Sequence, residues 1–298
     1  MTNDRFGMGR CTIVMLAAVA AVTGGSAASD GGAGASLRSA LTFHAPFDGT
    51  VDAVHGAGDR RLHWAPSFKE RAHAVPGLPP GGQVQHAAGA GRYGDALRFT
   101  AKGAPVVLFQ AARNVTYAPR DWSGTVSFWL STDPERDLPD GFCDPVQITP
   151  RAWNDAAFFV EFEKRAAGIP FRLGAYADFA VWNPAKRRFD DIPAVERPLI
   201  TVEQPPFAGG RWTHVLFTFE RFNTGRPDGA VRLYLDGTPR GELRNRQQTF
   251  TWAPEETVIA LGLGYVGLLD DLAVFDRVLT DEEIRTLQRL DGGVKTLR

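Results

Sequence analysis

The chain has 298 residues, and its 33 Lys plus Arg against 34 Asp plus Glu give a formal net charge of −1, which argues against a nucleic acid or an anionic membrane surface as partner. Hydrophobic residues make up 44% and charged residues 22%, proportions that exclude disorder of the main body. The 32 glycines and 20 prolines, with 11% aromatic residues, favour many short strands and turns over a helical bundle.

Residues 1–28 have the pattern of a secretory signal peptide. Two arginines precede an apolar run over 11–22, and small residues follow it. The run is shorter than the roughly 20 residues that span a bilayer, so an uncleaved anchor is the less favoured interpretation. We predict cleavage after Ala27 or Ala28, a flexible spacer over 29–40, and no transmembrane segment after cleavage. The protein is therefore expected to be exported, to the extracellular space, the periplasm or the cell surface.

From about Leu41 onward, short apolar or alternating runs are separated by turn residues. Alternation with one apolar face is typical of half-buried antiparallel strands. It occurs in Gly124–Ser131, Ala156–Lys164, Phe171–Trp182, Trp212–Glu220 and Ala230–Gly237. The last of these runs ends on Asp-Gly, which is a strong signal for a hairpin turn.

The rest of the pattern predicts long loops and one helix. Proline and charge gather over Thr132–Pro150 and Asn183–Pro206, which we predict to be loops that carry binding groups. Thr280 and Glu283 form a capping box at the start of a short C-terminal helix. Many strands and one short helix predict an all-β protein, built as a two-sheet antiparallel jelly-roll sandwich.

The last third of the chain resembles a known family. Three segments are similar to strands of the concanavalin A-like, laminin G-type (LamG) jelly roll. Its Trp-x-His strand resembles GGRWTHVLFTFE, its strand ending Tyr-x-Asp-Gly resembles GAVRLYLDGTPRGE, and its closing strand resembles VIALGLGYVGLLDDLAVFDRVLTDEEIRTL. Upstream, LTFHAPFDGT, GRYGDALRF and WSGTVSFWL look like its opening elements. The resemblance implies a single domain over 41–298 with a long middle insertion at about 132–206. Relatives bind carbohydrate, bind protein or cleave polysaccharide, and the fold does not choose among them.

The resemblance also implies a structural calcium ion. Asp270 lies in the otherwise apolar run GLLDDLAVF, and burial of an isolated charge is costly. In relatives the equivalent acid commonly helps to hold calcium together with backbone carbonyls, and Asp48 is expected to close the site. The alternative is a carboxylate that backbone N–H groups satisfy without a metal.

Glu161 and Glu163 are weak catalytic candidates. Two positions apart on a strand, they project from one face about 7 Å apart, near the separations that glycosidase acid pairs use. Glucanases of the family carry a Glu-x-Asp-x-Glu string, whereas this chain has no aspartate between its two glutamates. The alternative is a solvated or sugar-contacting strand face.

A mixed aromatic and charged surface is the best binding candidate. If the runs 156–164 and 171–182 pair as a hairpin, one surface holds Glu161, Arg172, Tyr176, Asp178 and Trp182. Flat aromatic rings stack on sugars, and charged groups hydrogen-bond hydroxyls; the alternative is an amphipathic sheet face beneath the long loops.

These observations predict a secreted or surface-associated recognition domain. It is expected to be non-catalytic, with a glycan as its ligand. The alternatives are a polysaccharide-cleaving enzyme of the same fold, either a glycoside hydrolase or a lyase, and a protein-binding or envelope structural module. The partner is accordingly a glycan or an extracellular protein.

Overall fold

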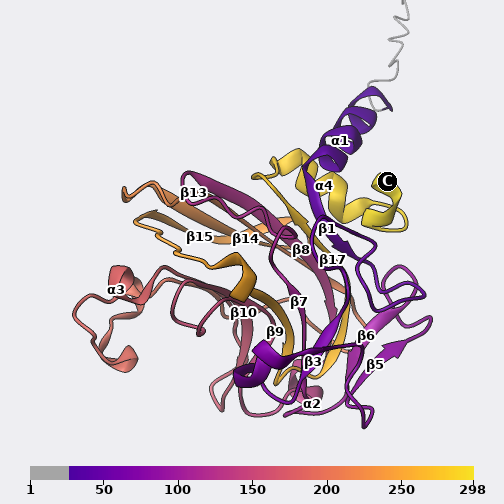
Figure 1. Ribbon diagram of the computed structural model, residues 1–298, viewed down its shortest axis with the longest axis horizontal. Coiled ribbons are helices and arrows are strands. Elements are labelled where there is room, and N and C mark those ends of the chain that lie inside the picture. The colour runs from indigo at the N-terminus through magenta and orange to yellow at the C-terminus, as the bar shows by residue number, and fades with distance from the viewer. Residues whose placement is uncertain (1–26) are drawn as a thin grey trace, which may run out of the picture.

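The computed structural model describes residues 27–298, with side chains from residue 32 onward (Figure 1). Two antiparallel sheets form a sandwich, so the predicted fold class is confirmed. Sheet A consists of β1 (Leu41–Ala45), β2 (His55–Gly56), β5 (Val84–Ala87), β6 (Ala96–Phe99), β8 (Trp122–Ser131), β13 (Thr213–Phe222), β14 (Gly229–Leu235), β15 (Thr238–Arg246) and β17 (Gly267–Phe275). Sheet B consists of β3 (His63–Ala65), β4 (Val75–Pro76), β7 (Val106–Gln110), β9 (Gly141–Thr149), β10 (Ala157–Lys164), β11 (Phe171–Tyr176), β12 (Leu199–Val202) and β16 (Val258–Leu263).

Helices are short and lie outside the sheets. The α-helices are α1 (Ala27–Ala40), α2 (Pro134–Asp137), α3 (Phe179–Trp182) and α4 (Asp281–Arg289). The 3-10 helices are η1 (Phe68–His73), η2 (Phe189–Asp191), η3 (Ala194–Glu196), η4 (Pro254–Glu256) and η5 (Val294–Leu297). In the part of the chain that the structure describes, none of these helices is long and apolar enough to cross a membrane.

The predicted alternation places one face of each strand in the core between the sheets. Val126 and Phe128 of β8 are buried there, as are Phe158 and Val160 of β10. Aromatic rings fill the centre, where the ring centroid of Trp122 lies 4.5 Å from that of Phe219. The strands predicted at 124–131, 156–164, 212–220 and 230–237 correspond to β8, β10, β13 and β14, and are confirmed.

Two local predictions rest on backbone geometry, and both are confirmed. Asp236 and Gly237 have φ angles of 52° and 70°, the positive pair that a tight hairpin turn with right-handed twist needs. At α4 the Thr280 side chain accepts a hydrogen bond from the Glu283 backbone N–H, and the Glu283 side chain accepts one from the Thr280 backbone N–H. Together these two bonds form the predicted capping box.

The predicted loop over Thr132–Pro150 is wrong for its second half. Residues Gly141–Thr149 form β9, an interior strand of sheet B between β10 and β16. Pro145 and Asp144 suggested a loop because neither favours a regular strand. The ladder accommodates them through a register shift opposite Glu161, between the pairs Val160↔Val146 and Phe162↔Cys143, so that two residues face one as in a β-bulge. The predicted loop over Asn183–Pro206 likewise contains the short strand β12.

The predicted strand over 171–182 is too long. β11 ends at Tyr176, and residues Phe179–Trp182 form the single helical turn α3. The reason is the Asp178 carboxylate, which accepts hydrogen bonds from the backbone N–H and the hydroxyl of Thr251. These bonds tie the chain to a neighbouring loop at the point where β11 would otherwise continue.

The predicted flexible spacer over 29–40 is also wrong, because these residues form most of α1. Glycines within a helix cost about 1 kcal/mol each relative to alanine, so the local sequence favours a helix poorly and docking has to stabilise it. Leu37 and Ala40 are buried in a cluster with Ile284 and Leu287 of α4, and Figure 1 shows α1 beside α4. The predicted signal peptide over 1–28 lies almost entirely outside the described residues.

The two sheets differ in how their outer faces are covered. Helices α1, α4 and η5 pack against the outer face of sheet A, over Leu216, Tyr234 and Ala273. On sheet B, Phe68 of η1 packs against the outer side of β3, β7 and β16. The outer face of β9 to β11 is covered instead by the loop that carries Trp153 and by the segment around η2, which leave a cavity above the sheet.

If α1 docks as described, Leu37→Ala should destabilise the whole domain. Loss of a buried leucine side chain is expected to lower the free energy of unfolding by about 2 kcal/mol or more. Ser39→Ala, at an exposed position of the same helix, is the matched control and should change it little. Equal stability of both variants and wild type in urea unfolding would show that residues 29–40 are a spacer after all.

Candidate functional site

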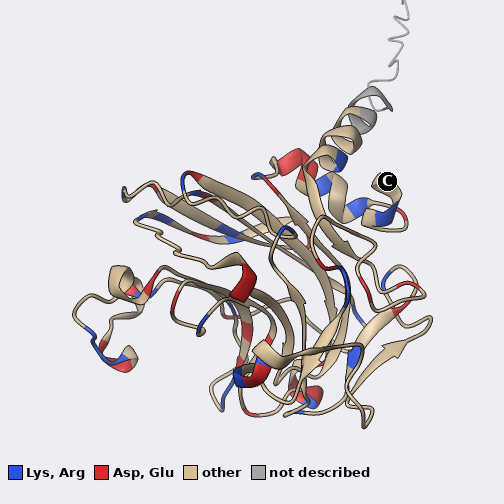
Figure 2. Ribbon diagram, viewed as in Figure 1, with Lys and Arg blue, Asp and Glu red and all other residues tan. Residues whose placement is uncertain are grey.

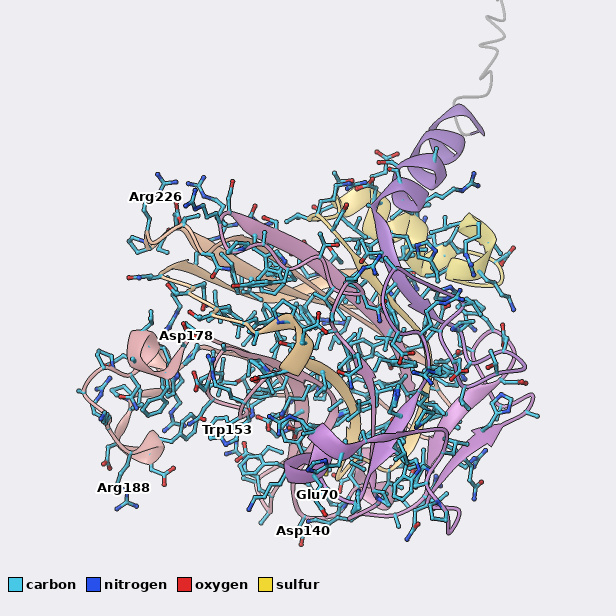
Figure 3. The ribbon with its side chains drawn as sticks, in the orientation of Figure 1. Glu70, Asp140, Trp153, Asp178, Arg188 and Arg226 are labelled. Carbon is cyan, nitrogen blue, oxygen red and sulfur yellow. The ribbon has the colours of Figure 1, made fainter. Side chains whose placement is uncertain are left out.

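A cavity of about 340 Å³ lies on the outer face of sheet B. Its floor comes from β9, β10 and β11, and its rim from the loop before β10 and the segment around η2. The lining residues are Phe142, Asp144, Gln147, Trp153, Phe159, Glu161, Arg172, Tyr176, Phe189, Asp190 and Leu199. Figure 3 labels Trp153 beside sheet B, and Asp178 and Arg188 on the segment that projects from it.

The floor is built around one arginine. Glu161 of β10 lies directly opposite Arg172 of β11, so the hairpin on which the predicted surface depended is present. Arg172 donates from Nε to Oε1 of Glu161 over 2.9 Å and from Nη1 to Oε2 of Glu163 over 2.8 Å. The side chains of Arg172 and Glu161 are only 10% and 8% exposed, so this is a nearly buried charge network.

This network limits what the two glutamates can do chemically. Burial raises the pKa of Glu161, and the charge and hydrogen bonds of Arg172 oppose that shift. Glu163 also contacts Arg165, whose Nη1 lies 3.4 Å from its Oε2. A glycosidase pair needs one acid that gives up a proton and one free carboxylate, whereas both glutamates here are held by the same guanidinium.

Asp144 is a site residue that the sequence analysis missed. It lies next to Glu161 across the bulge, in the wall of the cavity, and no described residue donates a hydrogen bond to its carboxylate. Burial, together with the negative charge of Glu161, raises its pKa well above the usual range. Alternation could have revealed this strand, because Asp144 and Gln147 point outward while Cys143, Val146 and Ile148 are buried. The bulge at Pro145 interrupts that alternation and hides the strand in the sequence.

Aromatic rings form the walls. Tyr176 and Phe159 are stacked with centroids 5.6 Å apart, and Trp153 meets Tyr176 edge-on at 5.4 Å and Phe189 at 5.6 Å. Gly174 makes this arrangement possible, because a Cβ atom there would come within 2.3 Å of the Phe159 ring. Trp153 and Phe142 are 41% and 58% exposed, and they are two of the four large hydrophobic side chains that the described chain exposes.

Tyr176 carries an unsatisfied polar group. Its side chain is fully buried, lines the cavity, and its hydroxyl has no hydrogen-bond partner among the described residues. Burial raises the pKa of this phenol, so the group is a neutral O–H. A buried hydroxyl without a partner costs about 1–3 kcal/mol, and a polar ligand in the cavity would relieve that cost.

Two predicted ligand contacts support the cavity from outside its lining. The Asp178 carboxylate lies 2.6 Å from Nη2 of Arg151 and ties the loops together through Thr251. Trp182 donates from Nε1 to the carbonyl of Asn154 over 2.8 Å, and its ring meets that of Tyr176 edge-on at 4.9 Å. Of the five residues predicted to share a surface, Glu161, Arg172 and Tyr176 line the cavity, while Asp178 and Trp182 lie behind its rim.

The two acids predicted to hold calcium lie on either side of the loop at 91–95. Asp48 accepts a hydrogen bond from the Asp95 backbone N–H over 2.9 Å, and its other oxygen lies 2.6 Å from Nζ of Lys295. Asp270 accepts from the Tyr93 backbone N–H over 3.1 Å, and its second oxygen is buried without a partner. The loop therefore joins the two acids through its backbone.

These residues do not fit a calcium ion as they stand. Calcium needs about six to eight oxygen ligands, and the described residues contain no group of three or more His, Cys, Asp or Glu side chains that could hold a metal. The ammonium of Lys295 already bridges Asp48 and the Tyr93 carbonyl. Burial raises the pKa of Asp270 to about 7, so its carboxyl is partly protonated near neutral pH, which lowers the cost of burying it. The calcium ion itself stays an untested prediction of the sequence.

The contact between Lys295 and Asp48 predicts that the fold is stable without calcium. We expect neither millimolar calcium nor a chelator to change the melting temperature of the wild type. Lys295→Met should lower the free energy of unfolding by about 1 kcal/mol or less, because the pair is partly exposed. A calcium-dependent rise in the melting temperature of the wild type would establish the metal site instead.

Asp270 predicts a specific pH dependence. Its pKa is raised in the folded state, so its stabilising contribution is complete below pH 3.8, the ordinary pKa of an aspartate, and is lost as pH rises from there through about 7. Asp270→Asn keeps an uncharged group of the same shape and should raise the melting temperature by several degrees above that range, with little change below pH 3.8. Calorimetry across pH checks this, and a lower melting temperature of the variant at every pH would contradict it.

Comparisons with known proteins identify the fold family. A model of the concanavalin A-like lectin/glucanases superfamily matches residues 111–285. Among solved structures, domain 4 of AbnA, a GH43 extracellular arabinanase from Geobacillus stearothermophilus in complex with arabinotriose, superposes with a TM-score of 0.52 at 17% identity, over 84% of this chain and 98% of that one. No curated protein sequence matches the chain.

Two toxin domains are similar in fold as well. The binding domain of Paraclostridial Mosquitocidal Protein 1 gives a TM-score of 0.54 at 14% identity, over 85% of this chain and 52% of that one. The botulinum neurotoxin serotype D ligand-binding domain in complex with N-acetylneuraminic acid gives 0.52 at 12%, over 86% and 52%. The chain thus spans about half of either toxin chain, and these identities show the fold alone. Because the family model covers more than half of the sequence, the protein belongs to the concanavalin A-like lectin/glucanases superfamily, as its strand motifs predicted.

Proposed function

We propose that this protein is a non-catalytic carbohydrate-recognition domain that binds a glycan in the cavity on sheet B. The observation that carries the proposal is the combination of exposed aromatic rings with two polar groups that no described residue bonds, the partly buried carboxyl of Asp144 and the buried hydroxyl of Tyr176. A binding site for a polar ligand is expected to join apolar walls to a few placed polar atoms. The solved structures of similar fold include one with arabinotriose and one with N-acetylneuraminic acid.

Each part of the cavity has a role in such binding. Trp153 and Phe142 offer flat faces at the rim, where a sugar ring can stack. Asp144, Gln147 and Tyr176 offer oxygen and amide groups that can bond hydroxyls. The network of Arg172 with Glu161 and Glu163 holds the floor rigid, which limits the entropy that binding costs. Export, as predicted from residues 1–28, would bring this surface to extracellular glycans.

Polysaccharide cleavage is the second candidate. It is favoured by the nearness of Asp144, whose pKa is raised well above its usual range, to Glu161, because an acid and a carboxylate side by side are what hydrolysis requires. If the protein releases reducing ends from a polysaccharide and Glu161→Gln abolishes that release, cleavage becomes the better-supported function. Co-purification of one protein partner with indifference to every glycan would favour the protein-binding alternative.

The binding proposal predicts a large effect of Trp153→Ala. Loss of the stacking surface is expected to weaken glycan binding at least tenfold, which is about 1.4 kcal/mol, without loss of folding because the side chain is 41% exposed. Val75→Ala, at another exposed apolar residue outside the cavity, is the matched control. The measurement is a glycan array followed by titration calorimetry of the best ligand, with and without calcium. Absence of binding to any glycan would overturn the proposal.

A further inference from the structure

Acidic side chains outnumber cations in the lining of the cavity. It holds three acids, Asp144, Glu161 and Asp190, against the single guanidinium of Arg172. That guanidinium is already engaged, because Nε, Nη1 and Nη2 each donate to Glu161 or Glu163. Among the described lining residues, no free cation remains to receive an acidic sugar, and Asp144 has no cation of its own. A positively charged ligand group beside Asp144 would therefore stabilise its carboxylate form.

The aromatic walls add to this preference. The face of an aromatic ring attracts cations by about 0.5–2 kcal/mol, and tryptophan does so most strongly. Two of the rings already face arginines, since Cζ of Arg197 lies 4.3 Å from the centroid of Phe189 and Cζ of Arg172 lies 5.3 Å from that of Phe142. By contrast, no described cation lies over the face of Trp153 or Tyr176, and both residues border the same cavity as Asp144.

Two polar groups in the cavity lack a hydrogen-bond partner among the described residues. Asp144 accepts no hydrogen bond from any described residue, and the buried hydroxyl of Tyr176 has no partner there either. An ammonium group carries three N–H donors and no acceptor. It can therefore donate hydrogen bonds to the Asp144 carboxylate and to the Tyr176 oxygen. A ligand with a carboxylate or sulfate group has no such donors to offer them. A hydroxyl could bond the same atoms, but it would bring no positive charge to stabilise the carboxylate form of Asp144.

We infer that the glycan bound in this cavity carries a free amino group, so that the ligand class is an amino sugar with its ammonium between Asp144, Tyr176 and the face of Trp153. This inference rests on the proposed function and makes it more specific. It excludes uronic acids and sialic acids as preferred ligands. N-acetylated amino sugars, in which the charge is removed, are expected to bind more weakly.

The test compares three soluble probes of matched length by titration calorimetry. They are a glucosamine oligosaccharide, the same oligosaccharide after N-acetylation, and an oligouronide, each at a pH where the amine is protonated. The amine form should bind at least tenfold more tightly than the N-acetylated form, and added salt should reduce that ratio because it screens the charges. The oligouronide should not bind measurably.

The variant Asp144→Asn separates charge from shape. It should reduce the ratio between the amine and N-acetylated forms to nearly one, while binding of the N-acetylated form is unchanged. Asp140→Asn is the matched control, because Asp140 is an exposed acid just before β9 that does not line this cavity (Figure 3), and it should keep the wild-type ratio. If Asp144→Asn does not fold, Asp190→Asn removes one charge from the exposed rim and should lower the ratio in the same direction.

The outcomes separate this inference from the proposed function. Equal affinity for the amine and N-acetylated forms, or preference for the oligouronide, would overturn the amino-sugar inference and leave carbohydrate recognition intact. Absence of binding to these probes and to every glycan of the array would overturn both. If Asp144→Asn keeps the wild-type ratio of affinities for the amine and N-acetylated forms, the preference for the amine does not arise from Asp144, and the inference is wrong.

Discussion

The site depends on the pairing of Arg172 with two glutamates on a nearly buried sheet face. Desolvation of three charges is unfavourable, and it is tolerated only where each charge finds partners in good geometry. Arg172 meets Glu161 through two of its nitrogens and Glu163 through the third. Removal of the arginine would leave buried carboxylates without compensation, a change that typically costs about 3–5 kcal/mol. Because this network engages all three nitrogens of the Arg172 guanidinium, the neighbouring Asp144 and Tyr176 remain without partners, and they give the cavity its unpaired polar groups.

The position of the cavity follows from how the sandwich is covered. Sheet A buries the outer side of Leu216, Tyr234 and Ala273 beneath α1, α4 and η5, so this part of the sheet is closed by packed helices. Over sheet B, the segment around η2 and η3 provides the rim, and β15 of the other sheet holds that segment in place. Arg246 donates from Nη1 to the Glu196 carbonyl over 2.8 Å and from Nη2 to the Val195 carbonyl over 3.0 Å. Figure 1 shows this segment projecting beyond the sheets, and Figure 2 shows charges of both signs along it.

Local periodicity predicted the strands and part of the site, whereas long-range contacts decided the rest. Glu161, Arg172 and Tyr176 were placed on one face because side chains alternate along a strand, and the hairpin register brings them together. The same rule failed for Asp178 and Trp182, because β11 ends before them where Asp178 bonds a distant loop.

Asp144 and Trp153 were missed for two further reasons. A bulge breaks the alternation around Pro145, and Trp153 comes from a loop whose position no periodicity encodes. The helix α1 shows the same limit, since its stability comes from contact with α4, about 240 residues away along the chain, rather than from its own sequence.

The row of side chains at the end of β10 supports the proposal that this face binds a glycan rather than hydrolyses it. The glucanases that the chain resembles carry a Glu-x-Asp-x-Glu string, in which three acids stand at alternate positions. Here the corresponding row is Glu161, Glu163 and Arg165, and Nη1 of Arg165 lies 3.4 Å from Glu163. The position between the glutamates is Phe162, which faces the core and packs against Phe207 at 4.7 Å. Two arginines thus contact the glutamates of this row, which suits a rigid floor for recognition better than a pair of groups that must exchange protons.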